Sequence, residues 1–225
     1  IDDSHRRHDP AYRNKVHRIE RCVFRNCRLV KTNGATGSPD CVILWCNNVY
    51  LNSWLADYHK GWSNWHIHET YLFEQAAPVF VKNWGMRQGL TIFANGLVQA
   101  PEGIEVMFWQ SGNATEDGYR LFRDYHMLYA MPSPEYWIRG KGVATRERQA
   151  WLDHGFSFAT AMSDPAPVPD LTTTVPTDTR PPVQALGFGS AVFLDCPDIG
   201  LRVVRDFFGR QRRNPPTAGA FEPAD

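Results

Sequence analysis

Residues 41–51 read CVILWCNNVYL, an apolar run interrupted only by Asn47 and Asn48. A run rich in β-branched and aromatic side chains is typical of a well-buried β-strand. The segment from Arg21 to Val30 is also typical of a strand, and residues 33–40 between the two have the composition of a turn. Together these segments predict an N-terminal β-hairpin.

Four of the five cysteines lie in this predicted hairpin, as two C-x4-C pairs: Cys22 with Cys27, and Cys41 with Cys46. A separation of five residues places the members of a pair on opposite faces of a strand, so bridges between the two segments are favoured over bridges within one. A zinc ribbon prefers C-x2-C, which makes metal the weaker alternative. The sequence therefore predicts a disulfide-linked hairpin, with the pairing left open.

Beyond the hairpin, helices and strands are predicted to alternate. Helices are expected from His66 to about Gly85, from about residue 116, over 145–152 and over 198–211. Strands are expected at 90–94, 104–109 and 185–194. No internal repeat is apparent. This order is typical of a layered, Rossmann-like α/β domain with a largely parallel sheet.

Composition shifts divide the chain into three parts. The predicted organisation is a flexible arm at 1–20, a single α/β domain at 21–212 with a Pro/Thr-rich loop at 163–182, and a loose tail at 213–225. The first residues carry neither an initiator Met nor the apolar core of a signal peptide, so we expect a processed piece of a longer precursor.

Charge and hydropathy exclude several classes of protein. The 24 basic and 24 acidic residues give a formal net charge of zero, which disfavours a nucleic-acid binder and a general attraction to membrane surfaces. No apolar stretch approaches the roughly 20 residues of a membrane span. The Asn113-Ala114-Thr115 triplet is a glycosylation acceptor, and with the clustered cysteines it predicts the secretory-pathway lumen (Golgi or ER) or the extracellular space.

Functional-type residues are densest between Asn64 and Glu69 (NWHIHE). Because histidines at i and i+2 diverge on a strand or helix, His66 and His68 can converge only in a loop or at a helix start. There His68 or Glu69 could serve as a general base. A first-turn carboxylate that favours the helix dipole is the plain alternative for Glu69.

Aromatic side chains suggest a second kind of site. Most of the eight tryptophans are expected in the core. Trp54, Trp62 and Trp65, in a segment between ordered elements, are candidates for a carbohydrate platform.

Four segments resemble glycosyltransferase family 61. They are a cysteine- and asparagine-containing strand at 21–27, Asn64-Trp65-His66 with Glu69 and Pro78 downstream, a small-residue strand at 187–192, and an amphipathic helix at 200–208. The resemblance implies one of two facing Rossmann-like lobes, and an inverting transfer from a nucleotide sugar in the secretory pathway.

The resemblance also implies residue roles. His66, His68 and Glu69 would be catalytic, and Trp62, Asn64 and Trp65 would bind a glycan or glycoprotein acceptor. No cofactor is expected in this chain, since the nucleotide-sugar donor would bind a missing C-terminal lobe or a second chain. The chain alone would then be inactive.

Two other classes of function stay open. One is a non-catalytic extracellular or structural assembly subunit, which the cysteines, aromatic residues and glycosylation triplet suit equally well. The other is a metal-dependent enzyme that uses His66 and His68 with Glu69 or Glu74.

Overall fold

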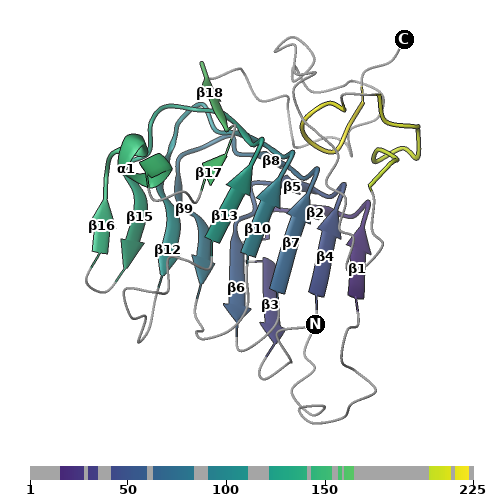
Figure 1. Ribbon diagram of the computed structural model, residues 1–225, viewed down its shortest axis with the longest axis horizontal. Helices are drawn as coiled ribbons and strands as arrows, with labels where there is room; N and C mark the ends of the chain where they lie inside the picture. Colours follow the sequence, from purple (N-terminus) through teal and green to yellow (C-terminus); the bar gives the residue numbers. More distant parts are fainter. Residues whose placement is uncertain are drawn as a thin grey trace.

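In the computed structural model of the protein, the chain winds into a three-sided parallel β-solenoid, in which each coil adds one strand to each of three sheets (Figure 1). The structure describes residues 16–27, 30–34, 42–59, 63–83, 91–110, 122–140, 143–153, 157–158, 160–164, 203–213 and 216–222.

The first sheet contains β1 (Val16–Glu20), β4 (Val42–Cys46), β7 (Ser63–Ile67), β10 (Thr91–Ala94), β13 (Phe122–Tyr125) and β17 (Ser157–Phe158). The second contains β2 (Val23–Arg25), β5 (Val49–Leu51), β8 (Thr70–Leu72), β11 (Leu97–Gln99), β14 (Leu128–Ala130) and β18 (Ala161–Ser163). The third contains β3 (Val30–Gly34), β6 (Leu55–His59), β9 (Ala77–Asn83), β12 (Ile104–Gln110), β15 (Tyr136–Gly140) and β16 (Val143–Thr145). Among the pairs of named strands in the described residues, only β15–β16 is antiparallel, and the helix α1 (Arg148–Asp153) follows it.

The corner between the first and second sheets is a two-residue turn that recurs in the first five coils. Its first residue has left-handed backbone, with φ between 50° and 56°, in Arg21, Asn47, His68, Asn95 and His126. Asparagine tolerates this conformation better than most residues. The turn redirects the chain into the next sheet instead of folding it back on itself, so successive coils stack with parallel strands.

Ladders of aromatic side chains fill the interior. Tyr50 stacks on Phe24 and Tyr71 along the second sheet, with ring centroids 4.9 Å and 4.5 Å apart. Along the first sheet, His66 is stacked between Trp45 and Phe93 at 5.7 Å and 4.7 Å. These buried rings contribute a large apolar area, and the stacking geometry adds to it.

The predicted layered α/β fold is wrong. The segments expected to form a hairpin pair in parallel, β1 with β4 and β2 with β5. The helix expected after His66 is replaced by β7, β8 and β9, and the one expected from about residue 116 by β13 and β14 in its described part. The described part of 198–211 contains no helix. The short helix expected at 145–152 is present as α1.

The predicted disulfide-linked hairpin is also wrong. Cys22, Cys27 and Cys46 carry free thiols, and Cys41 lies outside the described residues. The Cys46 Sγ lies 3.7 Å from Glu20 Oε2, and burial raises the pKa of this thiol to about 12. A buried thiol of this kind behaves as a small apolar side chain.

A C-terminal segment, defined here as residues 203–213 and 216–222, packs against the outside of the solenoid (yellow in Figure 1). Val203 covers the outward side chains of Leu44, Cys46 and Ile67 on the first sheet. Ala218, Ala220 and Phe221 cover the outward apolar residues of the second sheet, which are Val49, Leu51, Leu72, Leu97, Leu128 and Ala130. Parallel sheets are normally covered on both faces, and this segment supplies the outer cover here.

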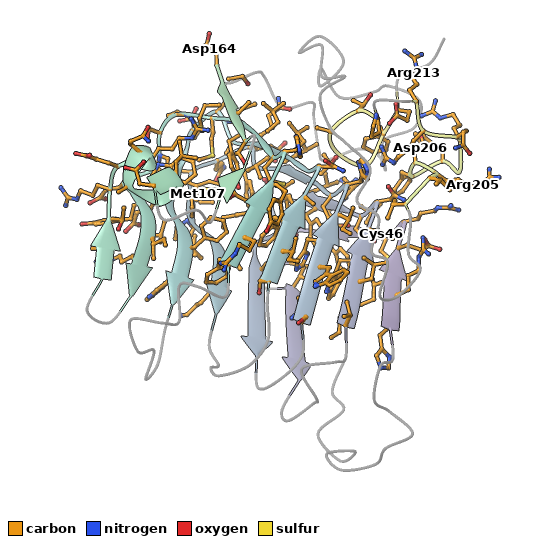
Figure 2. The ribbon with its side chains drawn as sticks, viewed as in Figure 1. Cys46, Met107, Asp164, Arg205, Asp206 and Arg213 are labelled. Atoms are coloured by element: carbon orange, nitrogen blue, oxygen red, sulfur yellow. The ribbon has the colours of Figure 1, made fainter. Side chains whose placement is uncertain are left out.

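Hydrogen bonds attach the C-terminal segment to the corner between the first two sheets. The Asn47 Nδ2 donates to the Arg205 carbonyl (2.8 Å), and the Gly219 N–H donates to the Asn95 carbonyl (2.7 Å). Figure 2 shows Arg205 and Asp206 on this segment, near the end of β4 where Cys46 is labelled.

Replacing Gly219 with alanine is expected to destabilise the protein by about 1–3 kcal/mol. Its φ is +88°, and an added Cβ would lie 2.7 Å from Thr70 Oγ1. Gly209→Ala is the matched control, because φ is +82° there and the nearest atom would be 3.7 Å away. Urea unfolding should show the larger loss for Gly219→Ala, and equal losses would contradict the tight contact.

Candidate functional site

His66 faces the interior of the solenoid and is 1% exposed. Its Nδ1 lies 3.4 Å from the Tyr71 hydroxyl and 4.0 Å from Glu69 Oε2. With Trp45 and Phe93 stacked on either side of the ring, a substrate has no route to this imidazole through the described residues.

Glu69 also points inward, from the corner after β7. Its Oε1 accepts hydrogen bonds from the backbone N–H (3.0 Å) and Nδ2 (3.1 Å) of Asn48. Burial raises the pKa of this carboxyl to about 7, against the opposing effects of His66, Tyr50 and Asn48. His66 and Glu69 therefore meet, as a buried pair inside the solenoid.

His68 is the first residue of the corner after β7, and it contacts different groups from those around His66. It is fully buried, and its Nε2 is 3.4 Å from Asn95 Nδ2. Burial, reinforced by the positive charge of Arg212, holds the pKa of this imidazole well below its usual value, while hydrogen bonds to the backbone of Thr217 and Gly219 oppose the shift. His68 thus contributes to the contact with the C-terminal segment and does not converge with His66.

The remaining predicted site residues are dispersed. Asn64 is buried, and its Oδ1 accepts from Trp45 Nε1 at 3.3 Å. Trp65 lies on the outer face of the first sheet, partly buried beside Val203. Trp62 and the predicted glycosylation site Asn113 lie outside the described residues.

Neither a metal cluster nor a membrane-spanning helix is found in the described part of the chain. No group of three His, Cys, Asp or Glu side chains there is placed to hold a metal ion. No described helix is long and apolar enough to cross a bilayer.

Two adjoining hollows form a groove along the corner between the second and third sheets, hereafter the corner groove. The first has a volume of about 370 Å³ and is lined by Asn26, Asn52, Trp54, Phe73, Glu74, Gln75, Ala76, Ala77 and Pro78. The second has a volume of about 520 Å³ and is lined by Ala76, Ala77, Pro78, Glu102, Gly103, Ile104, Glu105, Pro132, Ser133 and Glu135.

The corner groove runs across successive coils, because its lining residues occupy the same corner in the first to the fifth coil. At about 4.8 Å between neighbouring strands, five coils span roughly 19 Å. The three residues shared by both hollows, Ala76, Ala77 and Pro78, form the junction. This shape suits a chain molecule better than a single small ring.

Polar side chains in the first hollow hold one another in place. The Asn52 Nδ2 donates to Glu74 Oε2 (2.7 Å), and the Glu74 N–H donates to Asn52 Oδ1 (2.9 Å). Trp54 is partly buried against the interior cluster while it lines the hollow. An indole beside fixed amide and carboxylate groups offers an apolar surface together with hydrogen-bond donors and acceptors.

The charged side chains that line the groove are acidic, and two of them pair with arginines outside the lining, Glu105 with Arg139 (3.1 Å) and Glu135 with Arg146 (3.5 Å). The described lining includes four glutamates, Glu74, Glu102, Glu105 and Glu135, and no Lys or Arg. Trp54 is the groove residue that the sequence indicated as a carbohydrate contact. The glutamates of the second hollow carried no sequence signal, since residues about 30 apart become neighbours only when the coils stack.

Comparisons with protein-family models, with curated proteins and with solved structures found no match to this chain.

Proposed function

We propose that the chain is a carbohydrate-binding solenoid that holds an extended, uncharged glycan in the corner groove. The observation that carries the proposal is the groove across five coils, with Trp54 and the hydrogen-bonded Asn52–Glu74 pair in its first hollow and three glutamates in its second. A pyranose ring has an apolar face that can stack on an indole, and hydroxyl groups that donate to carboxylates and exchange hydrogen bonds with amides.

Charge defines the class of glycan. Glu105 pairs with Arg139 (3.1 Å) and Glu135 with Arg146 (3.5 Å), but both arginines lie outside the lining, to which only acidic groups contribute charge among the described residues. These carboxylates disfavour uronates and sulfated sugars and accept hydrogen bonds from neutral hydroxyls. The long groove favours several consecutive sugar units, each of which adds contacts. We therefore expect affinity to rise with chain length and to be lowest for monosaccharides.

This proposal places the sugar at the corner groove, away from the sealed interior that contains His66 and Glu69. It agrees with the sequence-based predictions of a carbohydrate ligand and an extracellular or luminal location, and it needs no catalytic step. The glycosyltransferase prediction stays untested, and the two functions differ in ligand, since a transferase lobe would act with a nucleotide sugar.

Blocking the groove is expected to lower glycan affinity at least tenfold. Ala76 is exposed at the junction of the two hollows, so Ala76→Arg fills the groove from outside the core. Trp54→Ala should give a loss of similar size, about 1.4 kcal/mol, by removing the stacking surface. Isothermal titration calorimetry with uncharged oligosaccharides of increasing length measures both effects.

Gln149→Arg, on the exposed face of α1, is the matched control for Ala76→Arg and should bind like the wild type. Thermal unfolding of each variant shows whether Trp54→Ala has damaged the fold. If it has, the glycan affinity of Ala76→Arg alone tests the proposal. Equal binding by Ala76→Arg and wild type would overturn the proposal. So would binding of a nucleotide sugar with no binding of free oligosaccharides.

A further inference from the structure

The outer face of the third sheet differs from those of the other two sheets. The C-terminal segment buries apolar side chains on the first and second sheets. On the third sheet, the outward side chains of Glu105 and Arg139 are 49% and 48% exposed, and Trp109 is 37% exposed. Trp109 is one of two large hydrophobic residues that the described part of the chain leaves exposed. An exposed tryptophan among charged residues is a common feature of a binding surface.

Three outward residues form a row across neighbouring strands. The strand register places Lys82 of β9 beside Trp109 of β12, and Trp109 beside Arg139 of β15. The Lys82 Nζ lies 4.0 Å from the centre of the indole. A cationic residue therefore flanks Trp109 on each neighbouring strand, at the spacing of adjacent strands, and the Lys82 ammonium covers one face of the indole.

Arg139 is held in a defined orientation. Its Nη1 donates to Glu105 Oε1 (3.1 Å), and its guanidinium lies 4.9 Å from the centre of the Tyr136 ring. Arg146 lies at the same distance from that ring, and its Nη2 donates to the Tyr136 hydroxyl (2.7 Å). A guanidinium has five N–H donors in a planar fork, and the contact to Glu105 uses one edge of it.

We propose that Lys82, Trp109 and Arg139 form a second carbohydrate subsite, which binds a sugar ring that carries a carboxylate or a sulfate. The ring stacks on Trp109, and its anionic group accepts charge-assisted hydrogen bonds from Lys82 and Arg139. To reach that group, the Lys82 ammonium exchanges an exposed cation–π contact, which is weak, for an ion pair with the ligand.

This subsite rests on the proposed function for its assignment to a glycan, and it adds a charge preference opposite to that of the corner groove. The two are adjacent, because Arg139 is bonded to Glu105, which lines the second hollow. A glycan with an uncharged backbone and acidic side units matches both surfaces. The backbone occupies the acidic groove, and an acidic unit reaches the row of Lys82, Trp109 and Arg139.

The test compares an uncharged oligosaccharide with the same oligosaccharide bearing a uronate side unit, by titration calorimetry at low and high salt. We expect the acidic ligand to bind about tenfold more tightly at low salt, and this advantage to shrink as salt screens the charges. Lys82→Met and Arg139→Gln should each remove about fivefold of the acidic ligand's affinity and leave the uncharged ligand within about twofold. Trp109→Ala should remove most of the advantage.

Arg18→Gln is the matched control, because Arg18 forms a similar exposed pair with Glu20 (2.7 Å) on the first sheet. It should leave both affinities unchanged. Equal affinity for the two oligosaccharides, with no effect of Lys82→Met, would overturn the subsite while the groove proposal stands. Failure of both ligands to bind would instead remove the proposed function. Binding of polyglutamate as tight as that of the acidic glycan would show a general polyanion surface and would also overturn the subsite.

Discussion

Replacing Arg212 with methionine is expected to destabilise the protein by roughly 3–5 kcal/mol, because it breaks a buried ion pair from one side. The Arg212 and Glu222 side chains are 0% and 2% exposed, with Nη1 and Oε1 2.9 Å apart. The Nη2 of Arg212 also donates to Asn47 Oδ1 (2.6 Å) and to the Gly219 carbonyl (3.0 Å). One guanidinium thus joins the C-terminal segment to the corner of the second coil.

After the substitution, the buried Glu222 carboxylate still accepts hydrogen bonds from the backbone N–H and the hydroxyl of Thr217, at 2.8 Å and 3.0 Å, but it has lost its ion pair. A carboxylate in this position either carries a large desolvation cost or takes up a proton. Urea unfolding at neutral pH measures the loss. Arg213→Gln, an exposed arginine in the same segment, should change the free energy of unfolding by less than about 0.5 kcal/mol.

The double variant Arg212→Met/Glu222→Met distinguishes the loss of the ion pair from the cost of leaving one charge buried alone. Because it removes both charges together, we expect it to recover part of the loss, so that the two single effects are not additive. A cost below about 1 kcal/mol for Arg212→Met would show that the C-terminal segment contributes little to global stability.

The positions of many strands could be predicted from the sequence, but not their pairing. The apolar run at 41–51 does form strands, with the corner residues Asn47 and Asn48 between β4 and β5. The left-handed turn at Asn47 divides what looks like one long strand. Two consecutive asparagines inside an apolar run were the available signal for this turn.

Irregular coil length concealed the repeat. His17, Ile43, Asn64, Thr91 and Phe122 share one register position, so successive coils are 26, 21, 27 and 31 residues long. A fixed period is the usual sequence signature of a solenoid, and this chain lacks one. The apolar residues after His66 recur at helix-like steps because a corner at 73–76 separates the strand pairs Tyr71-Leu72 and Val79-Phe80.

The dense cluster of functional-type residues at 64–69 has a structural explanation. Strand β7 and the corner after it contribute side chains both to the interior and to the contact with the C-terminal segment. The polar groups of 64–69 therefore stabilise the fold. The groove, in contrast, collects between one and six residues from each of five coils. Only Trp54 could be suggested from local composition, because the other lining residues meet through stacking.

The free energy of unfolding is expected to depend on pH through two adjacent buried groups with opposite signs. The pKa of Glu69 is raised to about 7 in the folded protein, so its stabilising contribution is complete below its unfolded value of 4.5 and is lost as pH rises through about 7. The pKa of His68 is held well below 6.5, so its contribution is present above 6.5 and is lost as pH falls through its folded pKa.

Two conservative variants separate these contributions. Glu69→Gln keeps an oxygen that accepts from Asn48 and removes the charge, so it should gain stability relative to the wild type as pH rises from about 4.5 to about 7. The gain is on the order of 3 kcal/mol. His68→Asn places at the corner a residue that already occupies the same position in Asn47 and Asn95, with left-handed backbone.

Urea unfolding of the wild type and both variants at a series of pH values gives the test, since groups common to all three cancel in the differences. Relative to the wild type, His68→Asn should gain stability as pH falls below 6.5, while Glu69→Gln gains as pH rises toward 7. A Glu69→Gln profile parallel to that of the wild type would show that Glu69 is not desolvated in the solenoid interior. A parallel His68→Asn profile would show that the C-terminal segment leaves His68 open to water.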